Sequence, residues 1–292
     1  MQPLKDSTLI ICGIIRDAEK SLKRNIPIIN SLCDKAKDYK IVIYENDSKD
    51  KTKLILKNWS VSRGTEKVHV QHNDNIIKDR VIPLFKEVSC NPFYSSKRIE
   101  KMVYLRNQYV SYIKRMKWEA DYIIVVDLDV SVLFLEGILS SFSLNIQWDA
   151  ITAYGYSFSP FLKKRYHDAY ALVEFGKEME PHTELKINAL ASKYGGMKYN
   201  DSPLRVFSAF GGLAIYRYEA FKDVEYRLIF NNDKFVEVYC EHYSVYYQMK
   251  KRGYDQIFIN PGMYLKYQTI TLNIIFRAFK KYILYNFKKF VL

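Results

Sequence analysis

Continuous apolar runs alternate with segments of helical period through the first half of the chain. Four runs predict strands: Leu9–Ile15, Lys40–Tyr44, Val68–Val70 and Tyr122–Val126. The segments between them have helical spacing over about residues 19–32, 52–59 and 97–118, with an irregular loop at 73–96. Tyr122–Val126 is apolar at every position, which is typical of a central strand in a parallel sheet. This alternation predicts a doubly wound α/β sheet that binds its ligand beyond the carboxyl ends of the strands.

The second half of the chain is less regular. Residues 151–154 and 208–217 have the composition of strands, and 231–251 is mixed. No Gly-, Ser- or Pro-rich linker and no internal repeat divides the sequence. We therefore predict one Rossmann-like α/β domain over residues 1–265 with a mostly parallel central sheet, followed by a separate tail at 266–292.

The tail has an amphipathic pattern. Its apolar residues recur at spacings of three and four: Leu272, Ile275, Phe276, Phe279, Tyr282, Ile283, Phe287 and Phe290. It also carries six basic residues and no acidic one. No apolar run approaches the roughly 20 residues that a membrane span requires. The pattern predicts a basic amphipathic helix lying on an anionic membrane surface. The alternative is a terminal helix that packs on its own domain and exposes its basic face.

The charge of the chain is concentrated in two places. The 292 residues include 45 Lys and Arg against 32 Asp and Glu, a net charge of +13. The tail contributes +6, and Tyr94–Lys117 contributes another +6, so the remainder is nearly neutral. This distribution argues against an extended nucleic-acid surface. The hydrophobic content of 48% excludes an intrinsically disordered chain.

The four cysteines and the N-terminus bear on the cell compartment. Cys12, Cys33, Cys90 and Cys240 show neither a CxxC spacing nor a paired pattern. Reduced thiols are the plain interpretation. Residues 1–8 are polar and precede a strand-like run without a small-residue cleavage site. We therefore expect no secretory leader and a cytoplasmic protein, associated peripherally with the cytoplasmic face of a membrane.

Two carboxylates follow the strongest predicted strand. Asp127 and Asp129 stand at positions i and i+2 directly after Tyr122–Val126, so both side chains leave the strand on one side. Paired anionic oxygens suit Mn²⁺ or Mg²⁺, which keeps free positions for phosphate oxygens. Such a metal neutralises a diphosphate leaving group. The alternative is a pair of surface aspartates in a turn.

An ordered set of short motifs resembles a known family. The motifs are Ile43–Thr52 (IYENDSKDKT), Arg106-Asn107, Val126–Asp129, Phe210–Ala214 (FGGLA) and Cys240-Glu241-His242. In this order they resemble GT-A glycosyltransferases, and among those the fungal capsule-associated α-mannosyltransferases and their bacterial relatives. The resemblance implies a GT-A fold and retaining transfer of a sugar from a nucleotide diphosphate. The donor favoured is GDP-mannose, with a UDP-sugar possible, and the acceptor is a glycan or lipid-linked glycan used in cell-surface polysaccharide synthesis.

We assign five further candidate residues to the donor site. By the resemblance, Glu45 matches the acid that hydrogen-bonds the nucleotide base or ribose, although it also suits a solvated turn. Arg16 lies where a guanidinium reaches ribose or diphosphate, and Arg106 offers a bidentate pair to phosphate or carboxylate. Gly211 and Gly212 interrupt a β-rich run, which is typical of close backbone approach to a ligand or of a bulge.

Glu241 and His242 are the remaining candidates. Glu241 is expected to orient the acceptor hydroxyl or accept its proton. If the transfer is retaining, as the resemblance implies, Glu241 acts as an electrostatic partner on the β-face of the sugar. His242 is expected to complete the metal shell or to hydrogen-bond the diphosphate, and its alternative is a satisfied structural histidine.

Two other classes of protein remain open. A hydrophobic strand followed by DxD also opens haloacid-dehalogenase-like phosphatases, where Asp127 would be the nucleophile. No Asp-Asp or Gly-Asp-x-x-x-Asp motif follows Asp129 to complete that pattern. A non-enzymatic basic protein that binds membranes or nucleic acid explains the charge but gives Glu45 no role.

Overall fold

The computed structural model describes residues 2–74, 81–159, 162–267 and 275, and the predicted tail at 266–292 therefore lies almost wholly outside the described residues. The strands are β1 Thr8–Ile15, β2 Asp38–Asn46, β3 Val68–Asn73, β4 Tyr122–Val126, β5 Ala150–Phe158, β6 Lys164–Tyr166, β7 Val173–Glu174, β8 Leu204–Ser208, β9 Leu213–Arg217 and β10 Ile257–Lys266. The helices are α1 Glu19–Cys33, α2 Thr52–Arg63, α3 Ser96–Arg115, α4 Leu135–Phe142, α5 Glu184–Lys193, α6 Tyr218–Phe221 and α7 Glu241–Lys251. Short 3₁₀ turns lie at Leu4–Asp6, Phe85–Glu87, Pro92–Tyr94 and Tyr194–Gly196.

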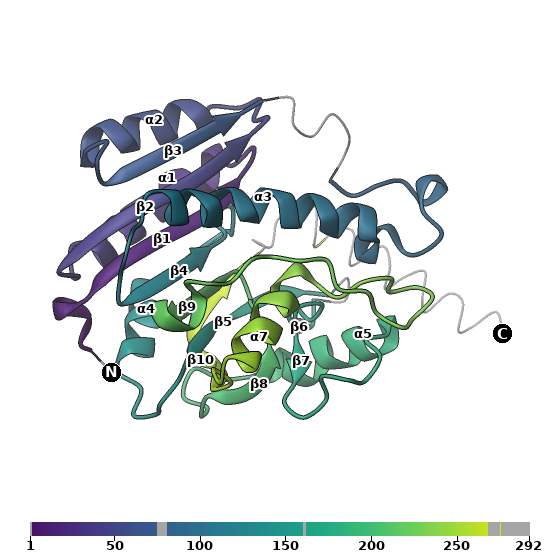
Figure 1. Cartoon of the computed structure of the whole chain (residues 1–292). Coiled ribbons are helices and arrows are strands. Elements are labelled where there is room, and N and C mark those ends of the chain that lie inside the picture. Colours follow the sequence, from purple (N-terminus) through teal and green to yellow (C-terminus); the bar gives the residue numbers. More distant parts are fainter. Residues whose placement is uncertain (1, 75–80, 160–161, 268–274, 276–292) are drawn as a thin grey trace.

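A ten-stranded sheet runs through the molecule (Figure 1). Its order is β3-β2-β1-β4-β9-β5-β10-β8-β7, with β6 paired to β5. In the first half, β3, β2, β1 and β4 are all parallel, as the alternation of strands and helices predicts. The carboxyl ends of β1, β2 and β4 therefore meet at one edge, which we call the carboxyl edge.

The second half adds antiparallel strands to the predicted sheet. β9 lies antiparallel between β4 and β5, and β8 is antiparallel to β10, whereas β5 and β10 are parallel. The run predicted as one strand at 208–217 is divided between β8 and β9 by a turn at Gly211 and Gly212, both with positive φ. Strands that follow one another through turns can reverse direction, whereas a parallel pair needs a longer crossover. The sheet as a whole is mixed.

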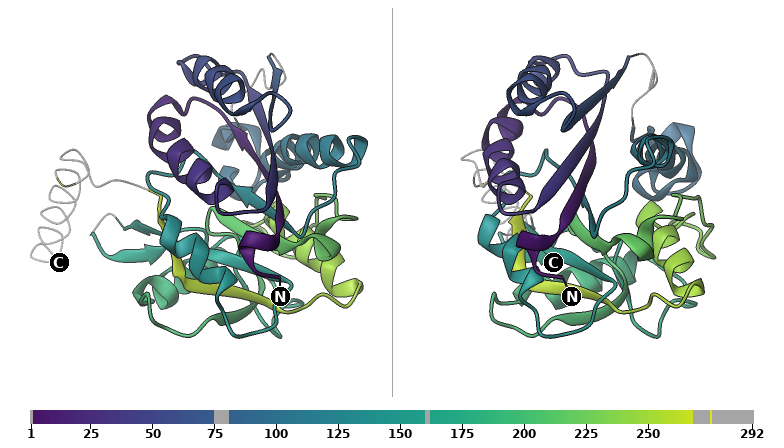
Figure 2. Two further views of the ribbon diagram at one scale, coloured as in Figure 1. Left: turned by 90° about the vertical axis from the view of Figure 1, so that its left-hand side faces the viewer. Right: turned by 60° about the vertical axis from the view of Figure 1, so that its left-hand side comes forward.

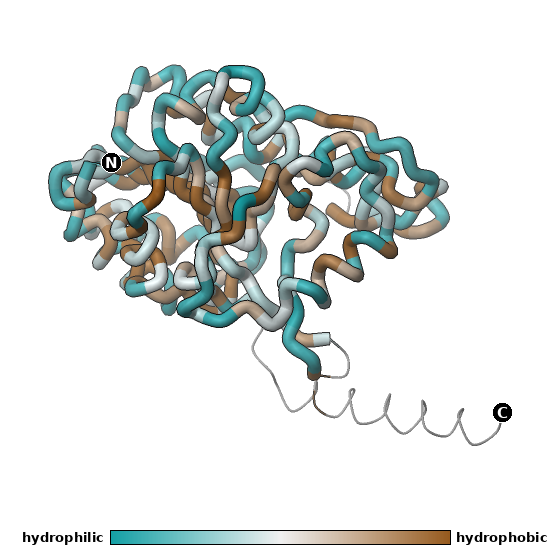
Figure 3. Tube along the Cα trace, turned by 90° about the horizontal axis from the view of Figure 1, so that it is seen from below, coloured by the Kyte–Doolittle hydropathy of each residue, from teal (hydrophilic) through white to brown (hydrophobic). Residues whose placement is uncertain are grey.

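Alternate residues of the central strands face two hydrophobic layers. Leu9 and Ile11 of β1 pack with α1, α2 and α4, whereas Ile10 and Cys12 pack with α3 and α7. Figure 2 shows α1 and α2 on one face of the parallel strands and α3 on the other. Both faces are covered, and Figure 3 shows the hydrophobic strands enclosed by hydrophilic connections. Every residue of β4 is buried, which explains why Tyr122–Val126 is uniformly apolar.

Two helix boundaries differ from the predictions. α3 begins after Ser95, whose side chain accepts a hydrogen bond from the Arg98 amide, and it ends at Arg115, three residues before the predicted end. β10 runs to Lys266, one residue past the predicted end of the domain. Among the described residues, no helix is both long and apolar enough to cross a membrane.

Candidate functional site

A cavity of about 420 Å³ opens at the carboxyl edge, where β4 ends. It is lined by side chains from α3, β4, the loop after β6, and the start of α7. Its charged lining residues are three arginines and three acids: Arg98, Arg106, Arg165, Asp127, Asp168 and Glu241. The prediction that a ligand lies beyond the carboxyl ends of the strands therefore agrees with the position of this cavity.

Asp127 is the first residue after β4. Its amide donates a hydrogen bond to the Gly212 carbonyl at 2.9 Å, which fixes the backbone against the start of β9. Its carboxylate lies 3.5 Å from the Arg106 guanidinium and accepts a hydrogen bond from the Tyr267 hydroxyl at 3.2 Å. Burial raises the pKa of Asp127 to about 7, neighbouring carboxylates add to the effect, and Arg106 only partly offsets it.

Arg106 joins α3 to α7. Its Nε donates to Glu241 Oε1 at 2.8 Å, and both side chains are buried. Although burial acts in the other direction, the Arg106 guanidinium lowers the pKa of Glu241 to about 2. Arg106 Nη1 is buried without a hydrogen-bond partner in the described part of the chain. One guanidinium thus bridges two of the predicted site residues and keeps one donor unused.

Asp168 is a third carboxylate of the cavity, and the sequence analysis did not identify it. It lies in the loop after β6 and accepts a hydrogen bond from the Gly211 amide at 3.3 Å. Burial, together with the nearby charge of Glu241, raises the pKa of Asp168 to about 6. No motif or periodicity marks this residue, because its partners are more than 40 positions away. Only the folded chain brings it to the others.

Gly211 and Gly212 allow this close approach. Both have positive φ, at 64° and 94°. A Cβ on Gly211 would lie 2.1 Å from the Ala153 carbonyl oxygen, and one on Gly212 would lie 2.8 Å from the Tyr267 ring. The paired glycines are therefore required by the backbone that presents amides and carbonyls to Asp127 and Asp168.

Asp129 and His242, both predicted as metal ligands, lie in different surroundings in the structure. The Asp129 side chain is exposed, outside the cavity lining. His242 is buried and stacks on Phe210 with ring centroids 3.8 Å apart. Neither ring nitrogen of His242 has a hydrogen-bond partner among the described residues, and burial lowers its pKa well below the usual range. No three His, Cys, Asp or Glu side chains of the described chain are grouped so as to hold a metal ion, so His242 does not join the two aspartates in one such set.

Glu45 and Arg16 lie along the same carboxyl edge but outside the cavity lining. Glu45 is fully buried; its Oε1 accepts from the Ser48 amide and its Oε2 contacts His72 Nδ1, both at 2.9 Å. Arg16, about one-third exposed, pairs with Asp17 at 3.4 Å. The structure thus places Glu45 in β2, one residue before the strand ends, with its buried side chain bonded to the turn that follows, where the sequence also allowed a solvated residue.

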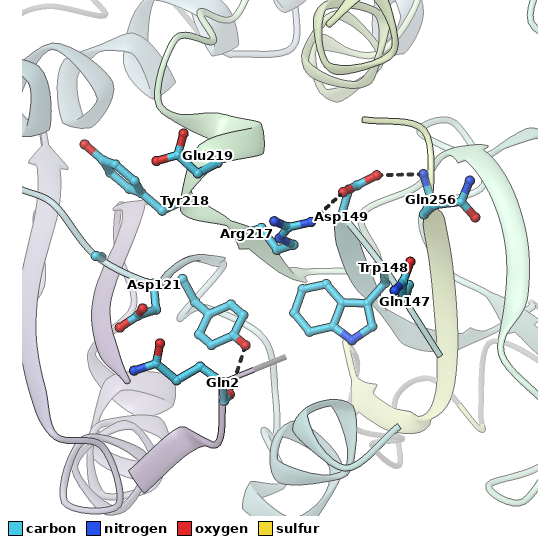
Figure 4. A pocket seen from close by; sticks show the side chains of 11 residues that line it. Gln2, Asp121, Gln147, Trp148, Asp149, Arg217, Tyr218, Glu219 and Gln256 are labelled. Atoms are coloured by element: carbon cyan, nitrogen blue, oxygen red, sulfur yellow. Dashed lines mark hydrogen bonds and ion pairs between the residues drawn. The ribbon is translucent and has the colours of Figure 1, made fainter. Parts of the chain in front are cut away.

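A second cavity, of about 540 Å³, lies at the opposite edge of the sheet (Figure 4). It is lined where β4, β5 and β10 begin and β9 ends. Asp149 points toward Arg217, which it contacts at 3.3 Å, and accepts a hydrogen bond from the Gln256 amide at 3.0 Å. We call it the amino-edge cavity.

A family model described as "Cryptococcal mannosyltransferase 1" matches residues 9–245. The match runs from β1 into the first half of α7, and so includes every predicted site residue. A search of curated proteins gave no match.

Solved structures resemble the chain at low identity. Mannosyltransferase PcManGT from Pyrobaculum calidifontis, in complex with GDP-Man and Mn²⁺, has 10% identity and a TM-score of 0.48, over 97% of this chain and 66% of that one. S. aureus TarS 1–349 with UDP-GlcNAc has 11% identity and a TM-score of 0.42, over 90% and 60%. M. tuberculosis glucosyl-3-phosphoglycerate synthase with Mn²⁺, UDP-Glc and phosphoglyceric acid has 10% identity and a TM-score of 0.41, over 93% and 76%. At this level of likeness, no function passes from them to this chain.

Proposed function

Because the chain belongs to the glycosyltransferase family described as Cryptococcal mannosyltransferase 1, we propose that it transfers a sugar, with mannose favoured, from a nucleotide diphosphate to a glycan acceptor. The observation that carries the proposal is the charge balance of the carboxyl-edge cavity. Asp127, Asp168 and Glu241 meet there around the buried guanidinium of Arg106. Arg98 and Arg165 also line the cavity, yet burial still raises the pKa of Asp127 and of Asp168. Such a site gains free energy when a cation enters it.

The residues present fit a divalent metal. Asp127 and Asp129 supply carboxylate oxygens, and Mg²⁺ or Mn²⁺ is commonly held by one or two carboxylates together with substrate phosphates. The raised pKa of Asp127 reflects an electrostatic cost that a bound cation would relieve. When bound, the metal supplies charge neutralisation for the departing diphosphate. His242 is buried against Phe210, and we propose that it shapes the wall of the cavity instead of binding metal.

Arg106 and Glu241 form one electrostatic unit. Arg106 lowers the pKa of Glu241 to about 2 and so keeps this carboxylate ionised. A carboxylate with such a pKa accepts a proton poorly near neutral pH. This favours Glu241 as a fixed negative charge beside the sugar over a deprotonating base, in keeping with a retaining transfer. The unused Nη1 of Arg106 is available to a diphosphate oxygen. Asp168, with a pKa of about 6, is better matched to orient the acceptor hydroxyl.

The nucleotide is proposed to lie along the ends of β1 and β2. Glu45 would act through the turn that it holds and through His72, since its own carboxylate has both of these partners. Arg16 would reach ribose or diphosphate from the end of β1. GDP-mannose is the favoured donor and a UDP-sugar the second candidate. The amides of Gly211 and Gly212 would line the sugar side.

The acceptor is proposed to be a glycan or lipid-linked glycan in cell-surface polysaccharide synthesis. A basic amphipathic tail at 266–292 would bring the enzyme to the cytoplasmic face of a membrane where such an acceptor is held. Removal of residues 277–292 should then reduce partitioning to anionic vesicles. Unchanged partitioning would contradict the membrane role.

The alternatives are not favoured. The family match is to glycosyltransferases, whereas a phosphatase would need a phospho-Asp127 intermediate. Formation of labelled phospho-Asp127 from a phosphate ester would reinstate that interpretation. Salt-sensitive DNA binding without any turnover of a nucleotide sugar would favour the non-enzymatic one.

The decisive experiment is a thermal-shift and turnover assay with GDP-, UDP-, dTDP- and CMP-sugars in the presence of Mn²⁺. Ligand binding to the folded state raises the melting temperature, so the true donor should do so in wild type. Asp129→Ala should abolish the metal-dependent part of the shift and the transfer. Glu219→Gln, an exposed residue of the amino-edge cavity, is the matched control and should behave as wild type. Normal turnover by Asp129→Ala would refute the mechanism.

A further inference from the structure

A groove lined by aromatic side chains adjoins the candidate site. It has a volume of about 490 Å³ and lies between β5, the start of β6, the loop after α5 and β10. Five rings line it: Tyr154, Tyr156, Phe158, Tyr199 and Tyr264. We call it the tyrosine groove. None of the predicted site residues lines this groove.

The groove is continuous with the carboxyl-edge cavity. Phe158, the last residue of β5, lines both. β9 is antiparallel to β4 and to β5, so β4 and β5 run the same way and end at the same edge. Tyr154, Tyr156 and Phe158 alternate along β5 and share one face. The Tyr154 ring is only 1% exposed, so the open part of this face consists of Tyr156 and Phe158, roughly 7 Å apart at about 3.3 Å per residue. A chain molecule with one end in the cavity would therefore extend past Phe158 and Tyr156 into the groove.

Three rings of the groove have free hydroxyls. Tyr199 is 52% exposed and packs edge-on against Tyr264 with centroids 5.8 Å apart, and Tyr264 of β10 lies beside Tyr154 of β5 in the sheet. The hydroxyls of Tyr156, Tyr199 and Tyr264 make no hydrogen bond to any residue in the described ranges. An aromatic face with a polar tip suits a ligand that is apolar on its ring faces and hydroxylated around its edge. Pyranose rings have this character.

The charge of the groove is positive. Lys164 and Lys198 line it, and none of its lining residues in the described part of the chain is acidic. Lys164 Nζ lies over the Tyr154 and Tyr156 rings, at 4.8 and 4.5 Å. Neither lysine forms an ion pair with a residue that the structure describes. Cations held beside aromatic rings without a carboxylate partner favour an anionic group on the ligand.

We propose that the tyrosine groove binds the acceptor, and that this acceptor is a saccharide chain carrying an acidic group. This proposal rests on the proposed function, because the ligand is an acceptor only if the protein transfers a sugar. Pyranose rings stack on the tyrosines, the tyrosine hydroxyls bond to the sugar hydroxyls, and Lys164 and Lys198 bind the acid. The terminal sugar then extends past Phe158 toward Asp168.

Calorimetric titration with two probes tests the groove without any turnover. The probes are a neutral manno-pentasaccharide and an oligogalacturonate of the same length. Wild type should bind both, and the acidic probe more tightly. Tyr199→Ala should weaken both about tenfold, the upper range for one aromatic contact. Lys164→Met and Lys198→Met should weaken only the acidic probe. Tyr247→Ala, a tyrosine on α7 outside both cavities and 38% exposed, is the control and should change neither.

The outcomes separate this proposal from the proposed function. Absence of binding to wild type, equal binding of the two probes, or wild-type affinity in Tyr199→Ala would overturn the groove as an acidic-saccharide site. Thermal stabilisation by the nucleotide sugar should survive Tyr199→Ala and be lost in Asp129→Ala. If Tyr199→Ala no longer binds the probes while no nucleotide sugar stabilises wild type, the result supports the groove as a saccharide site and refutes the proposed reaction.

Discussion

The two edges of the sheet carry cavities of opposite character, and β4 reaches both. At the amino edge the cavity is larger, about 540 Å³, and Asp149 has both an arginine and a backbone amide as partners. At the carboxyl edge the cavity is smaller, about 420 Å³, and the buried guanidinium of Arg106 pairs with both Asp127 and Glu241. The volume of a cavity therefore does not identify the site in this protein. The burial of its charged groups does.

The largest expected effect comes from removing the arginine at each edge. Arg106→Met should lower the free energy of unfolding by about 3–5 kcal/mol, because it leaves buried carboxylates without a partner. Arg217→Met should cost no more than about 1 kcal/mol, since Arg217 is 46% exposed and its pair with Asp149 is screened by water. Urea denaturation measures both. Equal losses would mean that the edges do not differ as described.

The second effect is a pH dependence at the carboxyl edge. The pKa of Asp127 is raised by burial to about 7 in the folded chain, whereas an unfolded aspartate ionises near 4. Between these values the folded state binds more protons than the unfolded state, so stability falls as pH rises and the loss is complete above about pH 7.

Asp127→Asn removes this cost. The melting temperature of Asp127→Asn should therefore exceed that of wild type progressively more from pH 5 to pH 8, in metal-free buffer. A constant difference across this range would contradict the raised pKa. Addition of Mn²⁺ should reduce the difference at pH 8, because a cation stabilises the wild-type carboxylate alone.

A smaller effect concerns the backbone. Gly212→Ala and Gly253→Ala both place a side chain at positive φ, at a cost of about 1–2 kcal/mol each. An added Cβ at Gly212 also meets the Tyr267 ring at 2.8 Å, whereas nothing lies within 4 Å at Gly253. Thermal denaturation should therefore show the greater loss for Gly212→Ala. Equal losses would show that Tyr267 moves aside freely.

The smallest effect is expected from Tyr267→Phe. This variant keeps the ring that stacks on His167 and removes only the hydroxyl that donates to Asp127. Since that hydrogen bond favours the ionised carboxylate, its loss should raise the pKa of Asp127 further. The free-energy contribution of the hydrogen bond is about 1 kcal/mol. The acidic limb of the pH–rate profile should shift to higher pH. An unshifted profile would show that the Tyr267 hydroxyl does not affect the pKa of Asp127.

Sequence pattern was sufficient where chemistry is local. A uniformly apolar strand followed by Asp127 predicted both β4 and the edge at which the cavity opens, and the family prediction is confirmed by the model that matches residues 9–245. Arg106 and Glu241 were each identified from their own surroundings. Their contact with each other, across 135 positions, was not.

The missed features depend on long-range packing. Asp168 has no neighbouring motif, and it becomes part of the site only because the turn at Gly211 presents an amide to it. The insertion of β9 between β4 and β5 likewise has no local signal, since an apolar strand is compatible with either direction. Polar neighbours that follow Glu45 in sequence left a solvated turn open as the alternative to a nucleotide-binding role, yet the fold encloses this side chain completely.

The position of β4 in the sheet also determines at what temperature the site loses its structure. Its five residues are buried and paired with β1 on one side and β9 on the other, and the Asp127 amide is bonded to Gly212. Amides in such a strand exchange with solvent only when the whole domain opens. The Asp127 carboxylate would then be among the last groups to lose its place on heating. Inactivation by heat should accordingly share its midpoint with global unfolding.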